Sequence, residues 1–255
     1  MIEVSRIAGE LAARAPRAGV FLDVDGTLAP IVARPELARV LPEIPPILAR
    51  LVGRLGVVAV VSGRPSGQVR DLVDVDGVMV IGTHGLEDEP PMKAEALDEI
   101  RTAAAAVGAW VEPKGAAAAV HFRGLEDPEA AETAVAGKLA VVAATHDLEV
   151  VPGKRILELA PARRPRKGGA VEWIARDREL EAALFAGDDV GDLDAFAALD
   201  RLRSLGVWTC SVAAHGPGVP AEVEAAADVV VDGPEGIASL LASIADGVER
   251  PASSG

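Results

Sequence analysis

Cysteine, aromatic side chains and positive charge are all scarce in this sequence of 255 residues. Its single cysteine, Cys210, excludes an internal disulfide framework and a zinc site built from several cysteines. A lone cysteine is also compatible with a reducing compartment. Aromatic residues make up only 3% of the chain and tyrosine is absent, so Ala, Val and Leu must fill most of the core. We expect Cys210 to be one more small, buried hydrophobic residue.

The balance of charge is strongly acidic. Lys and Arg number 25 against 39 Asp and Glu, which gives a formal net charge of −14. Such a field repels both a phosphodiester backbone and an anionic lipid surface, so we expect neither nucleic acid nor a membrane as a partner. A small anionic substrate remains compatible with this charge if cations are concentrated where it binds.

Long hydrophobic runs are also missing. The longest stretch without Asp, Glu, Lys or Arg, Ser204–Ala221, contains His215, Pro217, Pro220 and three glycines, and so cannot span a membrane. Residues 1–19 have the pattern of an amphipathic helix and not that of a signal peptide. The sequence therefore predicts a soluble, cytoplasmic protein with one large or two modest domains.

Both ends of the chain have the pattern of an open α/β sheet. Short apolar runs alternate with longer stretches rich in Ala, Leu and Glu, as in strands joined by crossover helices. Nearly continuous apolar strands indicate a parallel sheet that is covered on both faces. The expected strands are Val20–Val24, Val57–Val61, Val78–Ile81, Leu184–Ala186, Val207–Val212 and Val229–Val231. The expected helices are Pro42–Leu55, Ser66–Leu72 with Ser66 as its N-cap, and Pro234–Ile244.

The middle of the chain has a different pattern, in which two helices alternate with two hairpins. The expected helices are Ala94–Gly108 and Pro128–Thr145, and the expected strands are Trp110–Glu112, Ala118–Phe122, Leu148–Val151 and Arg155–Leu159. We therefore predict an α/β protein with a doubly wound parallel-sheet core, residues 1–90 and 163–255. An inserted α+β cap domain, residues 91–162, interrupts this core, and we expect a cleft between the two.

The strongest chemical signal is the segment Asp23-Val24-Asp25-Gly26-Thr27. It follows the first expected strand, at the edge where open α/β sheets bind their ligands. Strand alternation would point the two carboxylates to opposite faces, but Gly26 allows the chain to turn at once, so both can face one site. The same residues are also common in ordinary strand-ending turns.

Three further segments lie at strand ends or at a helix start: Ser62-Gly63-Arg64, Lys167-Gly168-Gly169 and Gly187–Asp192. Each alone has a simple explanation, namely a turn hydroxyl, a solvated basic residue or an acidic loop. Four such segments in this order are harder to explain separately, and together they favour one shared site.

These four segments resemble the motifs of the haloacid dehalogenase superfamily of phosphotransferases. The resemblance implies that Asp23 is the nucleophile that attacks phosphorus and that Asp25 is the general acid and base. Ser62 would hydrogen-bond the transferred phosphoryl group, and Lys167 would neutralise charge around it. The resemblance also implies that Thr27, Gly63 and Arg64 line the substrate site, and that Mg²⁺ is held by Asp23, Asp25 (through its backbone carbonyl), Asp188, Asp189 and Asp192.

The chemistry explains why such residues occur together. A phosphomonoester dianion repels a carboxylate nucleophile, so cations must offset the charge before Asp23 can approach. Oxygen ligands are those that Mg²⁺ prefers. Asp25 must give a proton to the leaving oxygen and later take one from water, which requires a tunable carboxyl group.

Three more segments, Gly82–Glu87, Glu112–Arg123 and Gly153–Glu158, resemble those of the trehalose-6-phosphate phosphatases. With them, the resemblance spans about Val20–Ala198. It implies hydrolysis of a sugar phosphate to trehalose and phosphate. We also expect a monomer, and a chain of 255 residues is too short to carry a glycosyltransferase as well, so we expect trehalose-phosphate synthase to be a separate protein. The resemblance also implies a sugar site that contains His84, Glu87, Glu112, Lys114, His121, Arg123 and Glu158.

Several positions depart from that family pattern and leave the sugar open. Gly191 and Leu193 replace a Thr and a Glu, Ala160 replaces an Arg, and Arg166 replaces an Asn. Sucrose 6-phosphate, glucosylglycerol phosphate and mannosylglycerate phosphate are alternative substrates, and a non-catalytic sugar-phosphate sensor is an alternative of another class. Trp110, Trp173 and Trp208 are expected to fill gaps or to cover domain seams.

Overall fold

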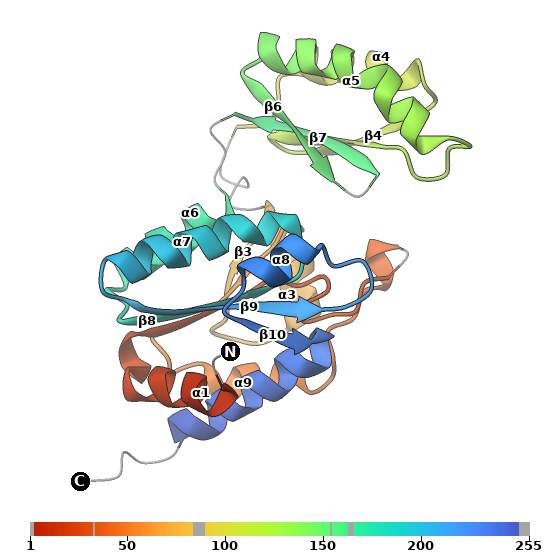
Figure 1. Ribbon diagram of the computed structural model, residues 1–255. Helices are drawn as coiled ribbons and strands as arrows, with labels where there is room; N and C mark the ends of the chain where they lie inside the picture. The colour runs from red at the N-terminus through yellow and green to blue at the C-terminus, as the bar shows by residue number, and fades with distance from the viewer. Residues whose placement is uncertain (1–2, 33, 84–89, 154, 163–165, 250–255) are drawn as a thin grey trace, which may run out of the picture. The chain divides into compact units, whose positions relative to one another are not determined.

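The computed structural model describes residues 3–32, 34–83, 90–153, 155–162 and 166–249. The predicted site residues His84 and Glu87 lie outside this part of the chain. The chain divides into two compact units, one from Met1–His84 with Arg166–Gly255 and the other from Gly85–Pro165. Each unit has a sheet and a hydrophobic core of its own (Figure 1).

The first unit, called the core unit, is built on a six-stranded parallel sheet. Its strands are β1 Ala18–Leu22, β2 Val57–Val61, β3 Met79–Ile81, β8 Ala182–Gly187, β9 Trp208–His215 and β10 Val229–Asp232, in the spatial order β10-β9-β8-β1-β2-β3. Strands β2 and β3 therefore follow β1 on one side, whereas β8, β9 and β10 follow in order on its other side. The carboxyl ends of β1 and β8 flank this switch point, where open sheets bind ligands.

Helices cover both faces of this sheet, which explains the continuous apolar runs of β1, β2 and β8 (Figure 1). Val20 and Leu22 point to one layer and Phe21 points to the other, as strand alternation requires. The first layer contains α1 Val4–Ala13, α2 Ile44–Leu51, α3 Ser66–Val73 and α9 Gly233–Glu249, and the second contains α6 Lys167–Asp177, α7 Leu193–Ser204 and α8 Ala221–Ala226.

Most expected elements of the core unit occur within a few residues of their predicted bounds, and the predicted fold class is confirmed. Strand β1 ends at Leu22, two residues earlier than expected, so Asp23 already lies beyond the strand. The prediction for Ser66 is wrong. Pro65 is the N-cap of α3, and the Ser66 hydroxyl instead accepts a hydrogen bond from the backbone N–H of Gly82 at 3.1 Å.

The second unit, called the cap unit, has a four-stranded antiparallel sheet in the order β4-β5-β7-β6 (Figure 1). Its elements are α4 Ala94–Ala105, β4 Trp110–Lys114, β5 Ala117–His121, α5 Pro128–Thr145, β6 Leu148–Gly153 and β7 Ile156–Pro161. The side chain of Asp127 caps α5 by accepting a hydrogen bond from the N–H of Ala130 at 3.0 Å.

The two faces of the cap sheet differ in chemistry. One face packs on α4 and α5 through apolar residues such as Val120 and Leu159. The strand register places Trp110 opposite His121, and Ala119 opposite both Glu112 and Glu158. Because directly opposed residues share a face, the polar side chains of these strands gather on the face away from the helices.

Cys210 is fully buried in β9, as predicted, and burial raises the pKa of its thiol to about 12. Trp208 is partly buried and packs against the core unit. Trp110 and Trp173 are exposed at 54% and 63%, so neither fills a gap within its own unit. Within the described part of the chain, no helix is both long enough and apolar enough to cross a membrane.

Candidate active site

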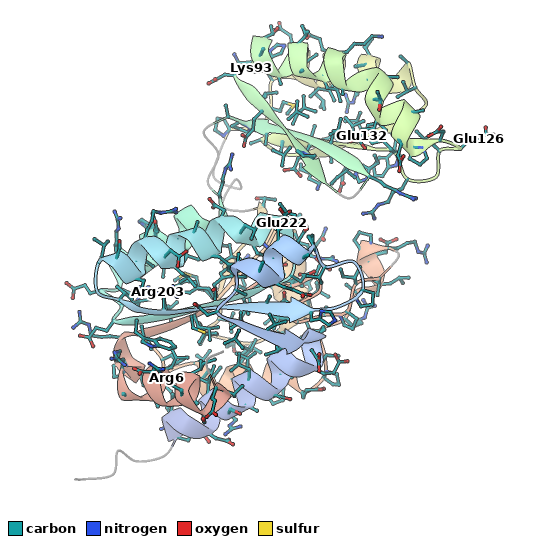
Figure 2. All side chains as sticks on the ribbon, viewed as in Figure 1. Arg6, Lys93, Glu126, Glu132, Arg203 and Glu222 are labelled. Atoms are coloured by element: carbon teal, nitrogen blue, oxygen red, sulfur yellow. The ribbon has the colours of Figure 1, made fainter. Side chains whose placement is uncertain are left out.

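Charged side chains lie mainly on the surfaces of their units, as Arg6, Lys93 and Glu126 illustrate (Figure 2). Among the described residues, only four charged side chains are buried: Asp23, Lys167, Asp188 and Asp192. All four come from segments that follow β1, begin α6 or follow β8, and they form one cluster. Because burying a charge is unfavourable unless it is paired, such a cluster marks a site with a chemical purpose.

Asp23 is held at the end of β1, where its backbone N–H donates to the carbonyl oxygen of Ala186 at 2.9 Å. The chain then turns at Gly26, whose φ of +86° lies in the left-handed region. A Cβ atom at this position would lie 2.0 Å from Oδ2 of Asp188. Glycine is therefore required at residue 26 for two reasons, the backbone conformation and the close approach of the β8 loop.

Lys167 is the first residue of α6, and its ammonium group bridges two carboxylates. Its Nζ lies 2.8 Å from Oδ1 of Asp23 and 2.6 Å from Oδ1 of Asp192. A cation is disfavoured at a helix N-terminus, so these carboxylates must hold it there. Although burial alone would lower the pKa of Lys167, Asp192 and Asp23 raise it above its ordinary value, so this lysine stays charged.

Asp192 is completely buried, and both of its carboxylate oxygens accept hydrogen bonds. Oδ1 accepts from Lys167, and Oδ2 accepts from the backbone N–H groups of Asp188 and Asp189 at 2.9 and 3.0 Å. The side chain of Asp189 is used differently. It is exposed and accepts a hydrogen bond at 2.7 Å from the N–H of Val190, the first residue of the 3₁₀ helix η4, Val190–Asp192.

The side chain of Asp188 completes an acidic group suited to a metal ion. Carboxylate oxygens of Asp23, Asp188 and Asp192 lie within 4.8 Å of one another. The hydroxyl of Thr27 donates to Oδ1 of Asp188 at 3.3 Å. An all-oxygen donor set of this kind fits a hard divalent cation such as Mg²⁺.

The pKa values report an excess of negative charge. Burial raises the pKa of Asp23 to about 7, with Lys167 opposing this shift and Asp192 adding to it. Burial and the neighbouring carboxylates of Asp23, Asp192 and Asp189 raise the pKa of Asp188 to about 8. One ammonium group faces three buried carboxylates, so a bound cation would relieve repulsion that protons must otherwise relieve.

The remaining predicted core residues gather on neighbouring strand ends. Ser62 follows β2 and is buried, and its Oγ accepts a hydrogen bond from the N–H of Arg64 at 3.2 Å. The guanidinium of Arg64 makes a bidentate pair with Asp25, with Nε–Oδ2 at 2.6 Å and Nη2–Oδ1 at 2.7 Å. Hydrogen bonding to Asp25 raises the pKa of Arg64 above its ordinary value. No local sequence pattern indicates this pair, which joins residues 39 positions apart.

On the polar face of the cap sheet, four of the predicted sugar-site residues lie together. His121 Nε2 is 2.9 Å from Oε2 of Glu112, and Lys114 Nζ is 3.5 Å from Oε2 of Glu158 and 3.9 Å from Oε2 of Glu112. Burial lowers the pKa of His121, and the hydrogen bond to Glu112 opposes this shift. Arg123 lies two residues beyond β5 and is exposed.

From the sequence, Asp194 has no expected role and Trp110 is expected only to fill a gap or to cover a domain seam. The side chain of Asp194 accepts a hydrogen bond from the N–H of Gly168 at 2.8 Å and so joins the start of α6 to the start of α7. Trp110 stacks on His121 in the cap unit. Its position two residues before Glu112 on a predicted strand is a signal that would have placed it on the same face as the sugar-site residues.

Solved structures with the same fold show the fold class of this chain. A haloacid dehalogenase-like hydrolase from Bacteroides thetaiotaomicron superposes with a TM-score of 0.67 at 14% identity, covering 88% of this chain and 98% of that chain. The C-terminal domain of trehalose-6-phosphate phosphatase from C. albicans superposes with a TM-score of 0.78 at 22% identity, covering 95% and 96%. The chain thus has the fold of the haloacid dehalogenase-like hydrolases.

Sequence comparison narrows this class to one family. The trehalose-phosphatase family model matches residues 21–225, and the chain belongs to this family. The trehalose-phosphate phosphatase of Mycolicibacterium paratuberculosis is 35% identical over 214 residues, which cover 75% of this chain and 53% of that protein. An uncharacterized glycosyl hydrolase of Mycobacterium tuberculosis, Rv2006, is also 35% identical over 214 residues but is covered over only 16% of its length. The chain therefore spans about half or less of the length of these curated relatives. The match to the family model confirms the predicted family resemblance.

Proposed function

We propose that this protein hydrolyses trehalose 6-phosphate to trehalose and inorganic phosphate, with Asp23 as the nucleophile. The observation that carries this proposal is the buried cluster in which Lys167 bridges Asp23 and Asp192 beside Asp188. A carboxylate that must approach a phosphate dianion needs compensating positive charge, which Lys167 would supply together with a cation bound by the carboxylates. Membership in the trehalose-phosphatase family supports the choice of substrate.

The reaction divides into two displacements at phosphorus. A carboxylate oxygen of Asp23 attacks, the bond to the sugar oxygen breaks, and Asp25 donates a proton to that oxygen. Asp25 then takes a proton from a water molecule, whose oxygen attacks the phosphorus of the aspartyl phosphate and releases inorganic phosphate and the Asp23 carboxylate. Ser62 and Lys167 bind the phosphoryl oxygens during both steps, and Thr27 and Gly63 line the same site.

Mg²⁺ is the cofactor that fits this donor set. Asp23 and Asp188 would hold it through their carboxylates and Asp25 through its backbone carbonyl, and when bound it supplies positive charge to the phosphoryl group. Asp189 and Asp192 act beside this site. Because both oxygens of Asp192 already accept hydrogen bonds, its main role is to hold Lys167 and the β8 loop in place.

The cap, which we assign to residues 91–162, selects the sugar. Glu112 and Glu158 provide acceptors and Lys114 provides donors for hydroxyl groups, and all three project from one sheet face. His121, Arg123, His84 and Glu87 complete the sugar site in this proposal. We propose further that the protein acts in the cytoplasm as a monomer, and that trehalose-phosphate synthase is a separate protein.

A phosphate-release panel tests the proposal. The protein is incubated with trehalose 6-phosphate, sucrose 6-phosphate, glucosylglycerol phosphate and mannosylglycerate phosphate, with Mg²⁺ or with EDTA. We expect release from trehalose 6-phosphate that requires the metal and disappears in Asp23→Asn. A clear preference for another sugar would overturn the substrate assignment, and binding of trehalose 6-phosphate without turnover would identify a sensor.

A further inference from the structure

The four phenylalanines of this protein fill its interior. Three of the four phenylalanines, Phe21, Phe122 and Phe185, are fully buried, and Phe196 is 3% exposed. Among the described residues, Trp110 and Trp173 are the aromatic side chains that are clearly exposed. A single exposed aromatic residue needs no explanation by itself, so the surroundings of each indole decide whether it can bind another molecule.

Trp110 is exposed but is held in one orientation. It is the first residue of β4, directly opposite His121 of β5. The indole and imidazole rings stack with their centroids 4.0 Å apart and an angle of 5° between their planes. His121 is in turn fixed by its hydrogen bond to Glu112 at 2.9 Å. The indole therefore has one face covered by a fixed ring and is still 54% exposed.

Trp110 also stands at the end of a polar row. Trp110, Glu112 and Lys114 are alternate residues of one strand, so their side chains share a face of the sheet along about 13 Å of β4. Lys114 is close to Glu158, which adds a second carboxylate to the row. Carboxylates, an ammonium group and an indole thus follow one another on a face that the cap helices do not cover.

This combination has the chemistry of a carbohydrate site. Hydroxyl groups of a sugar bind to carboxylate acceptors and ammonium donors, whereas the C–H groups on one face of a pyranose ring bind to a flat aromatic surface. Small-molecule sites typically combine such an apolar wall with a few fixed polar groups. An apolar protein partner would not use the two carboxylates and the ammonium group that adjoin the indole.

We propose that Trp110 is a specificity-determining residue that stacks against a pyranose ring of a disaccharide phosphate. This inference rests on the proposed function, and it adds an aromatic contact to the row of Glu112, Lys114 and Glu158. His121 supports the indole from behind and orients Glu112. The indole favours substrates with a second sugar ring over phosphate esters that lack one.

Kinetics of the full chain provide the first test. In Trp110→Ala we expect the KM for trehalose 6-phosphate to rise about tenfold, equivalent to about 1.4 kcal/mol of binding free energy, with kcat within about twofold. The ratio of kcat/KM for trehalose 6-phosphate to that for p-nitrophenyl phosphate should fall by the same factor. Trp110→Phe should recover part of this loss because it keeps an aromatic face. Trp173→Ala, which removes the other exposed indole, is the matched control and should leave the ratio unchanged.

Tryptophan fluorescence provides a test that does not depend on turnover. Free trehalose, which lacks the phosphate, is titrated into the protein. We expect the emission to change in the wild type and in Trp173→Phe, and the change to be absent in Trp110→Phe.

The outcomes separate this inference from the proposed function. If the wild type does not release phosphate from trehalose 6-phosphate, the proposed function fails. If the wild type does so but Trp110→Ala leaves the substrate ratio unchanged, only the present inference is overturned. An equal loss on both substrates would instead assign Trp110 to packing, and it would also overturn the inference.

Discussion

The cluster around Lys167 predicts a large energetic role for Asp192. Both carboxylate oxygens of Asp192 accept hydrogen bonds, but the amide of Asn has only one acceptor oxygen. In Asp192→Asn the NH₂ group must therefore face another donor, either the Lys167 ammonium or the N–H groups of Asp188 and Asp189. The substitution also removes one of the two carboxylates that keep Lys167 charged in a buried position. Removing one partner of a buried ion pair typically costs about 3–5 kcal/mol.

One effect opposes this loss. Asp192 raises the pKa values of Asp23 and Asp188, so its removal also relieves repulsion between carboxylates. At pH 6 this relief is reduced, because the raised pKa values of Asp23 and Asp188 shift both groups toward their protonated forms when no metal is bound. At that pH we therefore expect the loss to dominate, with the free energy of unfolding reduced by about 3 kcal/mol.

The assay is urea unfolding followed by far-UV circular dichroism at pH 6 in EDTA. The matched control is Glu181→Gln. Glu181 pairs with Arg17 at the same 2.6 Å distance as Lys167 and Asp192, but both side chains of the control pair are 50% exposed. An exposed ion pair contributes about 0–1 kcal/mol, so the control should unfold close to the wild type. If Asp192→Asn lost no more stability than the control, the claim that a buried ion network organises this site would be refuted.

Three other predictions follow from the same geometry. The bidentate pair of Arg64 with Asp25 should position the general acid, so Arg64→Lys should lower kcat/KM for trehalose 6-phosphate about tenfold. The loss should be much smaller for p-nitrophenyl phosphate, because only the sugar's leaving oxygen needs a proton. Equal losses on the two substrates would contradict this role of Arg64. The pKa of Asp188 is raised above its unfolded value, so its contribution to stability is present at low pH and is lost as the pH rises through about 8. Mg²⁺ binds the ionised carboxylates, so the rise in the protein's Tm on addition of Mg²⁺ should be larger at pH 8 than at pH 6. An equal rise at both pH values would contradict the metal site. In Glu158→Gln the KM for trehalose 6-phosphate should rise about tenfold with little change in kcat, and an unchanged KM would remove Glu158 from the sugar site.

Much of the core could be predicted because local chemistry determines it. Strands such as β2 are buried on both faces, so their residues are continuously apolar, and Val57–Val61 was predicted with its observed bounds. The spacing of Asp23, Asp25 and Gly26 required a turn at the end of a strand, and the positive φ of Gly26 provides that turn.

The remaining features depend on contacts between distant segments, which no local pattern encodes. The pairing of Arg64 with Asp25 requires β1 and β2 to lie side by side, and the bridging position of Lys167 requires α6 to begin beside both loops. The role of Ser66 could not be inferred either, because its hydroxyl partner, Gly82, comes from the end of β3. The exposure of Trp110 follows from the register of β4 on β5, which a hairpin pattern does not specify to the residue.

Transfer of the phosphoryl group to Asp23 is the central claim, and labelling tests it most directly. Trehalose 6-phosphate labelled in its phosphate is mixed with the protein and Mg²⁺, the reaction is stopped within one turnover, and the labelled peptide is located by mass spectrometry. We predict label on the peptide that contains Asp23 and none on Asp23→Asn, which should also release no phosphate. Continued turnover by Asp23→Asn, or label at another residue, would contradict the account.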